Sequence, residues 1–194
     1  MNTDNQLEIL EKEAGNCRKC KLWETRKNVV FGKGDIYTKI MFIGEAPGFN
    51  EDLRGIPFCG KAGNIFDELL SSVNLTRDEI YITNILKCRP PGNRDPESEE
   101  IAQCTPYLDK QIELINPEVL CCLGRYALNF MLQKFSFPKS EGISKVHGKM
   151  FSKDSLFDRV NIIAFYHPAV ATYDPRKIEL LKKDFEILKG VAKK

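Results

Sequence analysis

Four of the seven cysteines are spaced as ligands of one metal centre would be. Cys17 and Cys20 are separated by two residues in the stretch CRKC, so a single turn could present both thiolates to the same centre. Cys88 and Cys104 bracket the stretch KCRPPGNRDPESEEIAQC and could complete the site. Zinc and a 4Fe-4S cluster both accept four cysteines. The wide second pair favours the cluster, because zinc sites usually combine two closely spaced pairs.

The alternative is that CRKC is accidental and that Cys88 and Cys104 are core residues. Cationic neighbours of the first pair argue against it, since Arg18, Lys19 and Lys21 would offset the negative charge of a thiolate-bound centre. The other three cysteines are interpreted as small apolar side chains: Cys59, Cys121 and Cys122. Seven cysteines is an odd count, and the expected intracellular setting argues against a disulfide framework.

Three loops carry polar side chains at points where apolar segments end. GEAPG follows KIMFIG, Asn84 and Lys87 lie around the end of IYITNIL, and His167 ends the apolar part of RVNIIAFYHPA. In a parallel α/β sheet, ligands bind beyond the carboxyl ends of the strands. These three loops are therefore expected to meet at one ligand pocket.

The elements that would position these residues follow from the apolar pattern. Apolar strands alternate with helices, which predicts an α/β fold with a largely parallel sheet and helices on both faces. A looser region, 134–159, could hold a hairpin. Strands are expected at 39–44, 80–86, 118–124 and 159–169, and helices at 64–75, 125–133 and in the tail, where Ile178, Leu181, Phe185, Leu188 and Val191 repeat.

Two helix starts are visible in the sequence. Thr76 to Glu79 (TRDE) fits a capping box for a short turn. Asp95 and Pro96 read as an N-cap and a first helical residue. The helix after them would place apolar residues on one face, so that Cys104 points inward with Ile101, Leu108, Ile112 and Ile115.

Composition sets the broad class. Hydrophobic residues make up 42% and charged residues 29%, with a net charge of +2. No apolar run approaches the roughly 18 residues of a membrane span, and the first residues are acidic, unlike a secretory signal. We expect one domain over residues 1–194, located in the cytoplasm without contact to a membrane. Basic residues gather near the first cysteine pair and after Arg176, which favours either a phosphate-facing surface or solvated helix faces.

Together the motifs resemble a known family. GEAPGFNED (44–52), GIPFCGKAG (55–63), YITNILKCRPPGNRDP (81–96) and YHPA (166–169), with the four cysteines, are similar to the family 4 uracil-DNA glycosylases, the thermostable iron–sulfur branch of their superfamily. The resemblance runs from about Cys17 to about Ala169. It implies a three-layer αβα fold with a central four-stranded, mainly parallel sheet. It also implies a 4Fe-4S cluster on Cys17, Cys20, Cys88 and Cys104.

The implied activity is hydrolysis of the N-glycosidic bond of uracil flipped out of single- or double-stranded DNA, which leaves an abasic site for base excision repair. Two alternatives stay open: a superfamily relative with a broader range of damaged bases, and a metal-bearing DNA-binding module without catalysis. A monomer is expected, and the sequence does not reveal whether a sliding clamp is a partner.

The resemblance implies six uracil-binding residues: Gly44, Glu45, Ala46, Phe58, Asn84 and His167. Phe58 would stack on the base, Asn84 would pair with O4 and N3–H and disfavour cytosine, and backbone amides near Glu45 would meet O2. His167 would donate to O2 and stabilise the departing uracil anion, for which a neutral imidazole suffices. A core phenylalanine and loop-capping side chains are the competing interpretations. His147 is expected at the surface.

The carboxylate that activates water is less defined. Several related families have an aspartate where this chain has Ala46, so Glu45 is predicted to act with His167 as the catalytic pair. Glu51 and Asp52 are rivals, and by resemblance Glu51 would instead press against C5 of the base. A leucine often expected after HPA is absent, which leaves two residues to fill the gap in the DNA: Val170 and Tyr173.

Overall fold

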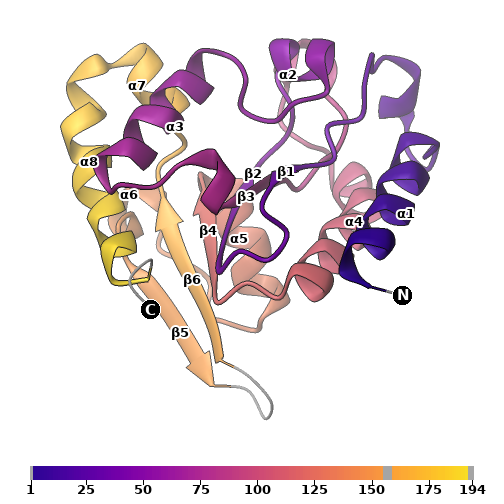
Figure 1. Ribbon diagram of the computed structural model, residues 1–194. Coiled ribbons are helices and arrows are strands. Elements are labelled where there is room, and N and C mark those ends of the chain that lie inside the picture. Colours follow the sequence, from indigo (N-terminus) through magenta and orange to yellow (C-terminus); the bar gives the residue numbers. More distant parts are fainter. Residues whose placement is uncertain (1, 155–158, 192–194) are drawn as a thin grey trace.

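The computed structural model describes residues 2–154 and 159–191, and within these ranges a six-stranded sheet lies between two layers of helices (Figure 1). The strand order is β1-β3-β2-β4-β6-β5. The four inner strands are parallel, and β1 and β5 are antiparallel edge strands. The strands are β1 (Lys33–Gly34), β2 (Ile40–Gly44), β3 (Tyr81–Asn84), β4 (Val119–Leu123), β5 (Met150–Asp154) and β6 (Arg159–Phe165). The predicted parallel centre is confirmed, and the structure adds the two edges.

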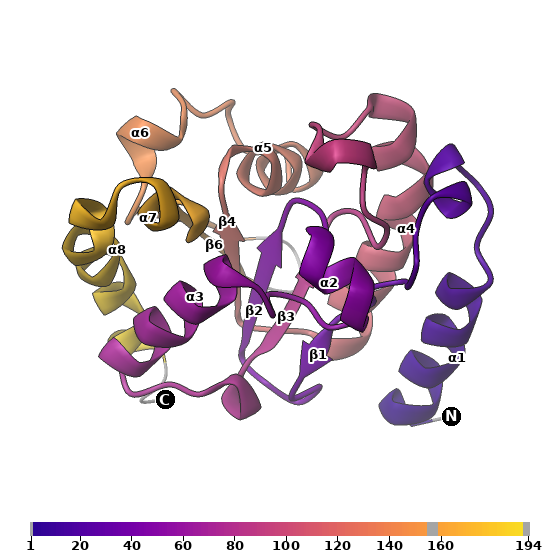
Figure 2. The same cartoon turned by 90° about the horizontal axis from the view of Figure 1, so that it is seen from above.

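Helices cover both faces of the sheet, as the view from above shows (Figure 2). Alternate residues of β2 divide between them: Met41 and Ile43 pack with α1, α4 and α5, whereas Ile40 and Phe42 pack with α3 and α8. The helices are α1 (Thr3–Gly15), α2 (Phe49–Arg54), α3 (Lys61–Ser72), α4 (Ser98–Ile115), α5 (Arg125–Lys134), α6 (Ile143–Val146), α7 (Ala169–Tyr173) and α8 (Ile178–Phe185). None of the helices in the described ranges is long and apolar enough to cross a membrane.

The predicted start of α4 is wrong. The helix begins at Ser98, and its N-cap is Glu97, which forms a capping box with Glu100. The Glu100 carboxylate also accepts hydrogen bonds from both terminal guanidinium nitrogens of Arg94, at 2.9 and 2.6 Å. These bonds hold the loop before the helix close to its first turn. Asp95 instead pairs with Arg125 of α5 at 2.8 Å. The inward position of Cys104 is confirmed, since its side chain is buried in the core.

Other elements follow the predictions more closely. The TRDE capping box is present. The hairpin expected within 134–159 is only partly found: β5 lies in this region, but it pairs antiparallel with β6, which was predicted as a separate strand, and α6 occupies 143–146. Residues 155–158 lie outside the described residues. The final helix is α-helical to Phe185 and continues as a 3-10 helix over Glu186–Gly190, which still buries Leu188.

Candidate functional site

A cavity of about 500 Å³ lies where β2, β3 and β6 end, as the topology rule predicts. Five of the six predicted uracil-binding residues line it: Glu45, Ala46, Phe58, Asn84 and His167. The sixth, Gly44, lies directly beside the wall. The three loops that the sequence singled out therefore meet at one pocket.

Gly44 makes room for two side chains of the wall. It ends β2 opposite Asn84 of β3. A Cβ atom at this position would overlap Asn84 Oδ1 and lie 2.9 Å from Cζ of Phe58. Glycine is therefore required for the asparagine and the aromatic ring to approach each other this closely.

Asn84 has an unused hydrogen-bonding group. Its side chain is only 2% exposed, yet Oδ1 has no hydrogen-bond partner within the described part of the chain. A buried polar atom without a partner costs about 1–3 kcal/mol, so such atoms usually serve a ligand or a mechanism. The amide is thus suited to recognise a polar molecule in the cavity.

Phe58 is held in a backbone conformation that is unusual for a residue with a side chain. Its φ angle is +51°. Arg77 Nη2 donates to the Phe58 carbonyl at 2.6 Å, and a Cβ at Gly63 would overlap that oxygen. The ring lies nearly parallel to the His167 imidazole, with centroids 5.4 Å apart. Strain of this kind occurs at sites where a side chain must keep one position.

The hydrogen bond that His167 accepts fixes its protonation. The Ala169 amide donates to Nδ1 at 3.1 Å, so Nδ1 carries no proton and the neutral ring carries its hydrogen on Nε2. Burial lowers the pKa of His167 to about 4. The imidazole is therefore a neutral donor at physiological pH.

Glu45 is the carboxylate that is free to handle a proton. It is half-buried in the cavity wall, and within the described residues its carboxylate makes no hydrogen bond or ion pair. Burial raises its pKa, the negative charge of Asp95 adds to this, and Arg125 acts in the opposite direction. A carboxylate with a raised pKa and no fixed partner can accept a proton from water.

The two rival carboxylates are committed to the backbone. Glu51 lines the cavity, but its Oε1 accepts from the amides of Cys59 and Gly60, each at 3.0 Å. Asp52 is buried away from the cavity and accepts from the Lys27 amide at 2.9 Å. Their geometry suits holding loops in place.

Exposed aromatic side chains stand at the mouth of the cavity. Tyr173, at the end of α7, is 88% exposed, whereas Val170 is half-buried. Phe49, which the sequence analysis did not single out, is 53% exposed at the start of α2. The Lys27 ammonium and the Arg89 guanidinium lie 5.9 and 5.2 Å from the centre of its ring. The mouth thus combines rings with cations, as single-stranded nucleic acid sites do.

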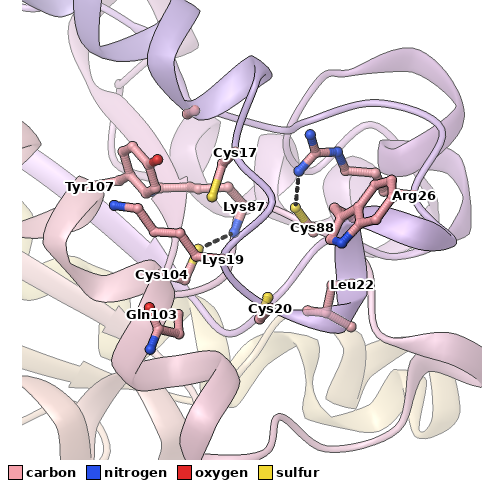
Figure 3. A pocket seen from close by; sticks show the side chains of 12 residues that line it. Cys17, Lys19, Cys20, Leu22, Arg26, Lys87, Cys88, Gln103, Cys104 and Tyr107 are labelled. Atoms are coloured by element: carbon pink, nitrogen blue, oxygen red, sulfur yellow. Dashed lines mark hydrogen bonds between the residues drawn. The ribbon is translucent and has the colours of Figure 1, made fainter.

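The four predicted metal-binding cysteines line a second cavity, between α1, α4 and the loop after β3. Figure 3 shows Cys17, Cys20, Cys88 and Cys104 arranged around a common space. All four are free thiols. Residues 71 and 87 positions apart in the chain therefore come together here, as the prediction of a shared centre requires.

Cationic and amide groups face these thiols. Arg26 Nη1 donates to Cys88 Sγ at 3.2 Å, and the Lys87 amide donates to Cys104 Sγ at 3.2 Å (Figure 3). Burial raises the pKa of Cys20 and Cys88 and raises that of Cys104 to about 12. Donors to sulfur favour a negatively charged thiolate centre.

The prediction for His147 is wrong. The side chain is half-buried, and Nδ1 lies 2.7 Å from Asp184 Oδ2. Its ring packs on Tyr166, with centroids 4.4 Å apart. Because Asp184 is 37 residues away on α8, the local sequence carries no signal of this pair.

The chain is similar to known proteins along nearly all of its length. The sequence model of the uracil DNA glycosylase superfamily matches residues 31–189. A type-4 uracil-DNA glycosylase of Archaeoglobus fulgidus is 45% identical over 180 residues, covering 93% of this chain and 90% of the relative. One from Saccharolobus solfataricus is 44% identical, covering 95% and 86%, and one from Thermotoga maritima is 40% identical, covering 97% and 95%.

Proposed function

The chain belongs to the uracil DNA glycosylase superfamily, and from this premise we propose which of its residues read uracil, which hydrolyse the bond and what the cysteines hold. Its activity is that of a uracil-DNA glycosylase, a hydrolase of DNA repair, and its substrate is DNA. The observation that carries the assignment of residues is the convergence of Phe58, Asn84 and His167 on one cavity.

Uracil is recognised by an aromatic face and two polar side chains. The base, rotated out of the DNA, stacks on Phe58 while the Asn84 amide pairs with O4 and N3–H. The partnerless Oδ1 of Asn84 supports this role, because N3–H of uracil is a donor that would satisfy it. Cytosine has an acceptor at N3 and a donor at N4, the reverse of uracil. The oxygen of the Asn84 amide would then face an acceptor, and its NH2 group would face a donor.

His167 stabilises the leaving group. As the bond between C1′ and N1 breaks, its electron pair moves to uracil and negative charge gathers on O2. A neutral Nε2–H aimed at O2, with backbone amides near Glu45 and Ala46, strengthens its hydrogen bond as that charge grows. The Ala169 amide on Nδ1 supports this role, since it leaves the hydrogen on Nε2.

Glu45 orients the water. The carboxylate accepts a proton as the water oxygen bonds to C1′, and its negative charge also balances the positive charge on the sugar. Uracil leaves as an anion and takes up a proton from solvent, while Glu45 returns its proton to solvent, so the products are free uracil and an abasic site. Glu51, tied to two amides, keeps the 55–60 loop and Phe58 against the base.

The four cysteines hold a 4Fe-4S cluster in this proposal. The four thiols line one cavity, which supports a shared centre. Four cysteines suit a 4Fe-4S cluster, and the wide spacing of Cys88 and Cys104 along the chain favours the cluster over zinc. Bound there, the cluster ties the N-terminal segment to the segment 88–104. Arg26 and the Lys87 amide would stabilise its thiolates.

The surroundings of the pocket support a DNA-binding mouth. Tyr173 is the better candidate to fill the gap left by the flipped nucleotide, because it is exposed at the rim where Val170 is half-buried. One sheet and its two helical layers take in elements from Thr3 to Gly190, which supports a single domain over 1–194. The proposal also includes that the protein acts as a monomer in the cytoplasm.

The test uses single- and double-stranded oligonucleotides that carry one uracil or one hypoxanthine, with alkali to cleave abasic sites. The wild-type protein should cut at uracil alone. Cutting at hypoxanthine would indicate a broader base range, and binding without cutting would indicate a non-catalytic module.

Glu45→Gln tests the water-handling role. Turnover should fall by about 10²- to 10⁴-fold while binding to uracil-containing DNA stays within about twofold. Glu99→Gln, which changes an exposed carboxylate of α4, is the matched control. Undiminished turnover in Glu45→Gln would remove this residue from the mechanism.

A further inference from the structure

Lys87 is a buried lysine whose ammonium group meets three neutral acceptors. Its side chain is 1% exposed. Nζ donates to Thr83 Oγ1 at 2.6 Å, to the Asn84 carbonyl at 2.8 Å and to Gln111 Oε1 at 2.6 Å. All three hydrogens of the ammonium are thereby used. No carboxylate pairs with it within the described residues.

The acceptors are themselves anchored to the core. Thr83 Oγ1 donates to the Phe31 carbonyl at 2.7 Å. Gln111 Nε2 donates to the same carbonyl at 2.9 Å and to the Tyr81 hydroxyl at 3.0 Å. The ammonium therefore holds a fully paired polar frame between β3 and α4, and such frames fix positions strongly because few alternative arrangements satisfy every group.

This frame lies between the two cavities. The Lys87 amide donates to Cys104 Sγ, and Cys88 is the next residue along the chain. In the other direction, the ammonium grips the carbonyl of Asn84, whose side chain forms the wall of the uracil pocket. One residue thus contacts both the thiol site and the backbone of the base-reading asparagine.

No hydrogen bond fixes the Asn84 side chain through its oxygen, because Oδ1 has no partner in the described ranges. The direction of the amide depends on the backbone of Asn84 and on the close fit against Gly44. A buried ammonium is costly, and an apolar side chain would fill the same volume. A lysine here fits a position that must be fixed to within about 0.5 Å.

We propose that Lys87 is a positioning residue for uracil recognition. By holding the Asn84 carbonyl, it fixes the position of the amide that reads the base. Because its own backbone amide donates to Cys104, it also links this position to the arrangement of the thiol site. This inference rests on the function proposed above.

The test compares Lys87→Met with Gln111→Leu. Both remove a buried member of the same frame, so a purely structural role would affect both alike. Only the first removes the bond to Asn84. Single-turnover excision from a uracil-containing single strand should fall by about 10- to 100-fold in Lys87→Met and by less than about threefold in Gln111→Leu, because small misplacements of a recognition group carry large kinetic costs.

A double-mutant cycle with Asn84→Ala gives the decisive readout. If Lys87 acts through Asn84, Lys87→Met should reduce excision by less than about twofold in the Asn84→Ala background. The iron content of Lys87→Met should equal that of the wild type, which separates the effect on Asn84 from loss of the thiol centre. Should Lys87→Met not fold, Lys87→Arg keeps the charge but cannot converge on three acceptors, and it should show the same selective loss.

The proposal is overturned if the losses of Lys87→Met and Asn84→Ala add fully, or if Gln111→Leu loses as much as Lys87→Met. Failure of the proposed function gives a different result, since the wild-type protein itself would then leave uracil in the strand.

Discussion

The protonation of His167 can be tested by the pH dependence of excision. With a pKa of about 4, roughly one molecule in 1,000 carries the second imidazole proton at pH 7. At the ordinary pKa of 6.5, about one in four would carry it. Neutral-donor and charged-acid mechanisms therefore predict different profiles between pH 5 and 8.

The neutral-donor account predicts a rise followed by a plateau. Glu45 must be ionised to take a proton, and because its pKa is raised, the rate should increase with pH through a value above 4.5 and then show no fall that depends on His167. A charged-acid account requires the rate to fall again as the imidazolium loses its proton. Single-turnover rates on a single-stranded oligonucleotide with one uracil, at half-unit steps of pH, distinguish the two.

His167→Ala removes the donor and should lower the single-turnover rate by about 10²- to 10³-fold, the usual cost of losing one preorganised donor to a developing oxyanion. The matched control is His147→Gln, because the chain has only two histidines and this one binds Asp184. A falling limb between pH 6 and 8 that is present in the wild type and absent from His167→Ala would refute the reasoning.

Three further perturbations follow from the contacts. Gly44→Ala would push a methyl group into Asn84 and Phe58, so kcat/KM should fall by about 10²-fold with little change in circular dichroism; a rate within twofold of wild type would contradict the packing argument. Cys104→Ser should lose iron and its visible absorbance, and its Tm should fall by about 10 °C, whereas full iron content would exclude Cys104 as a ligand. Tyr173→Ala should slow excision from double strands by about tenfold and from single strands much less, and equal loss on both substrates would count against a gap-filling role.

The centre of the fold was predictable because buried parallel strands are short continuous apolar runs. β2 and β4 are buried at every position, and their sequences carry that signal. The edges carry less of it: β1 is two residues long, and β5 is largely exposed. The start of α4 was misplaced because Glu97 and Glu100 form a capping box that competes with the Asp95-Pro96 signal.

The pocket was predictable to the extent that its residues lie at or just after the ends of strands. Asn84 ends β3, and His167 lies two residues after the end of β6. The topology rule brings such residues together. Groups whose partners lie far along the chain carried no signal: Lys87 binds Gln111, 24 residues away, and Arg26 binds Cys88, 62 residues away. The roles of the six uracil-binding residues and four cysteines stay predictions until they are tested.

The most direct test of the account is the structure of the wild-type protein crystallised with free uracil. The account predicts the ring stacked on Phe58, O4 and N3–H paired with the Asn84 amide, and O2 within hydrogen-bonding distance of Nε2 of His167. Uracil bound outside this cavity, or bound in it with O2 turned away from His167, would contradict the account.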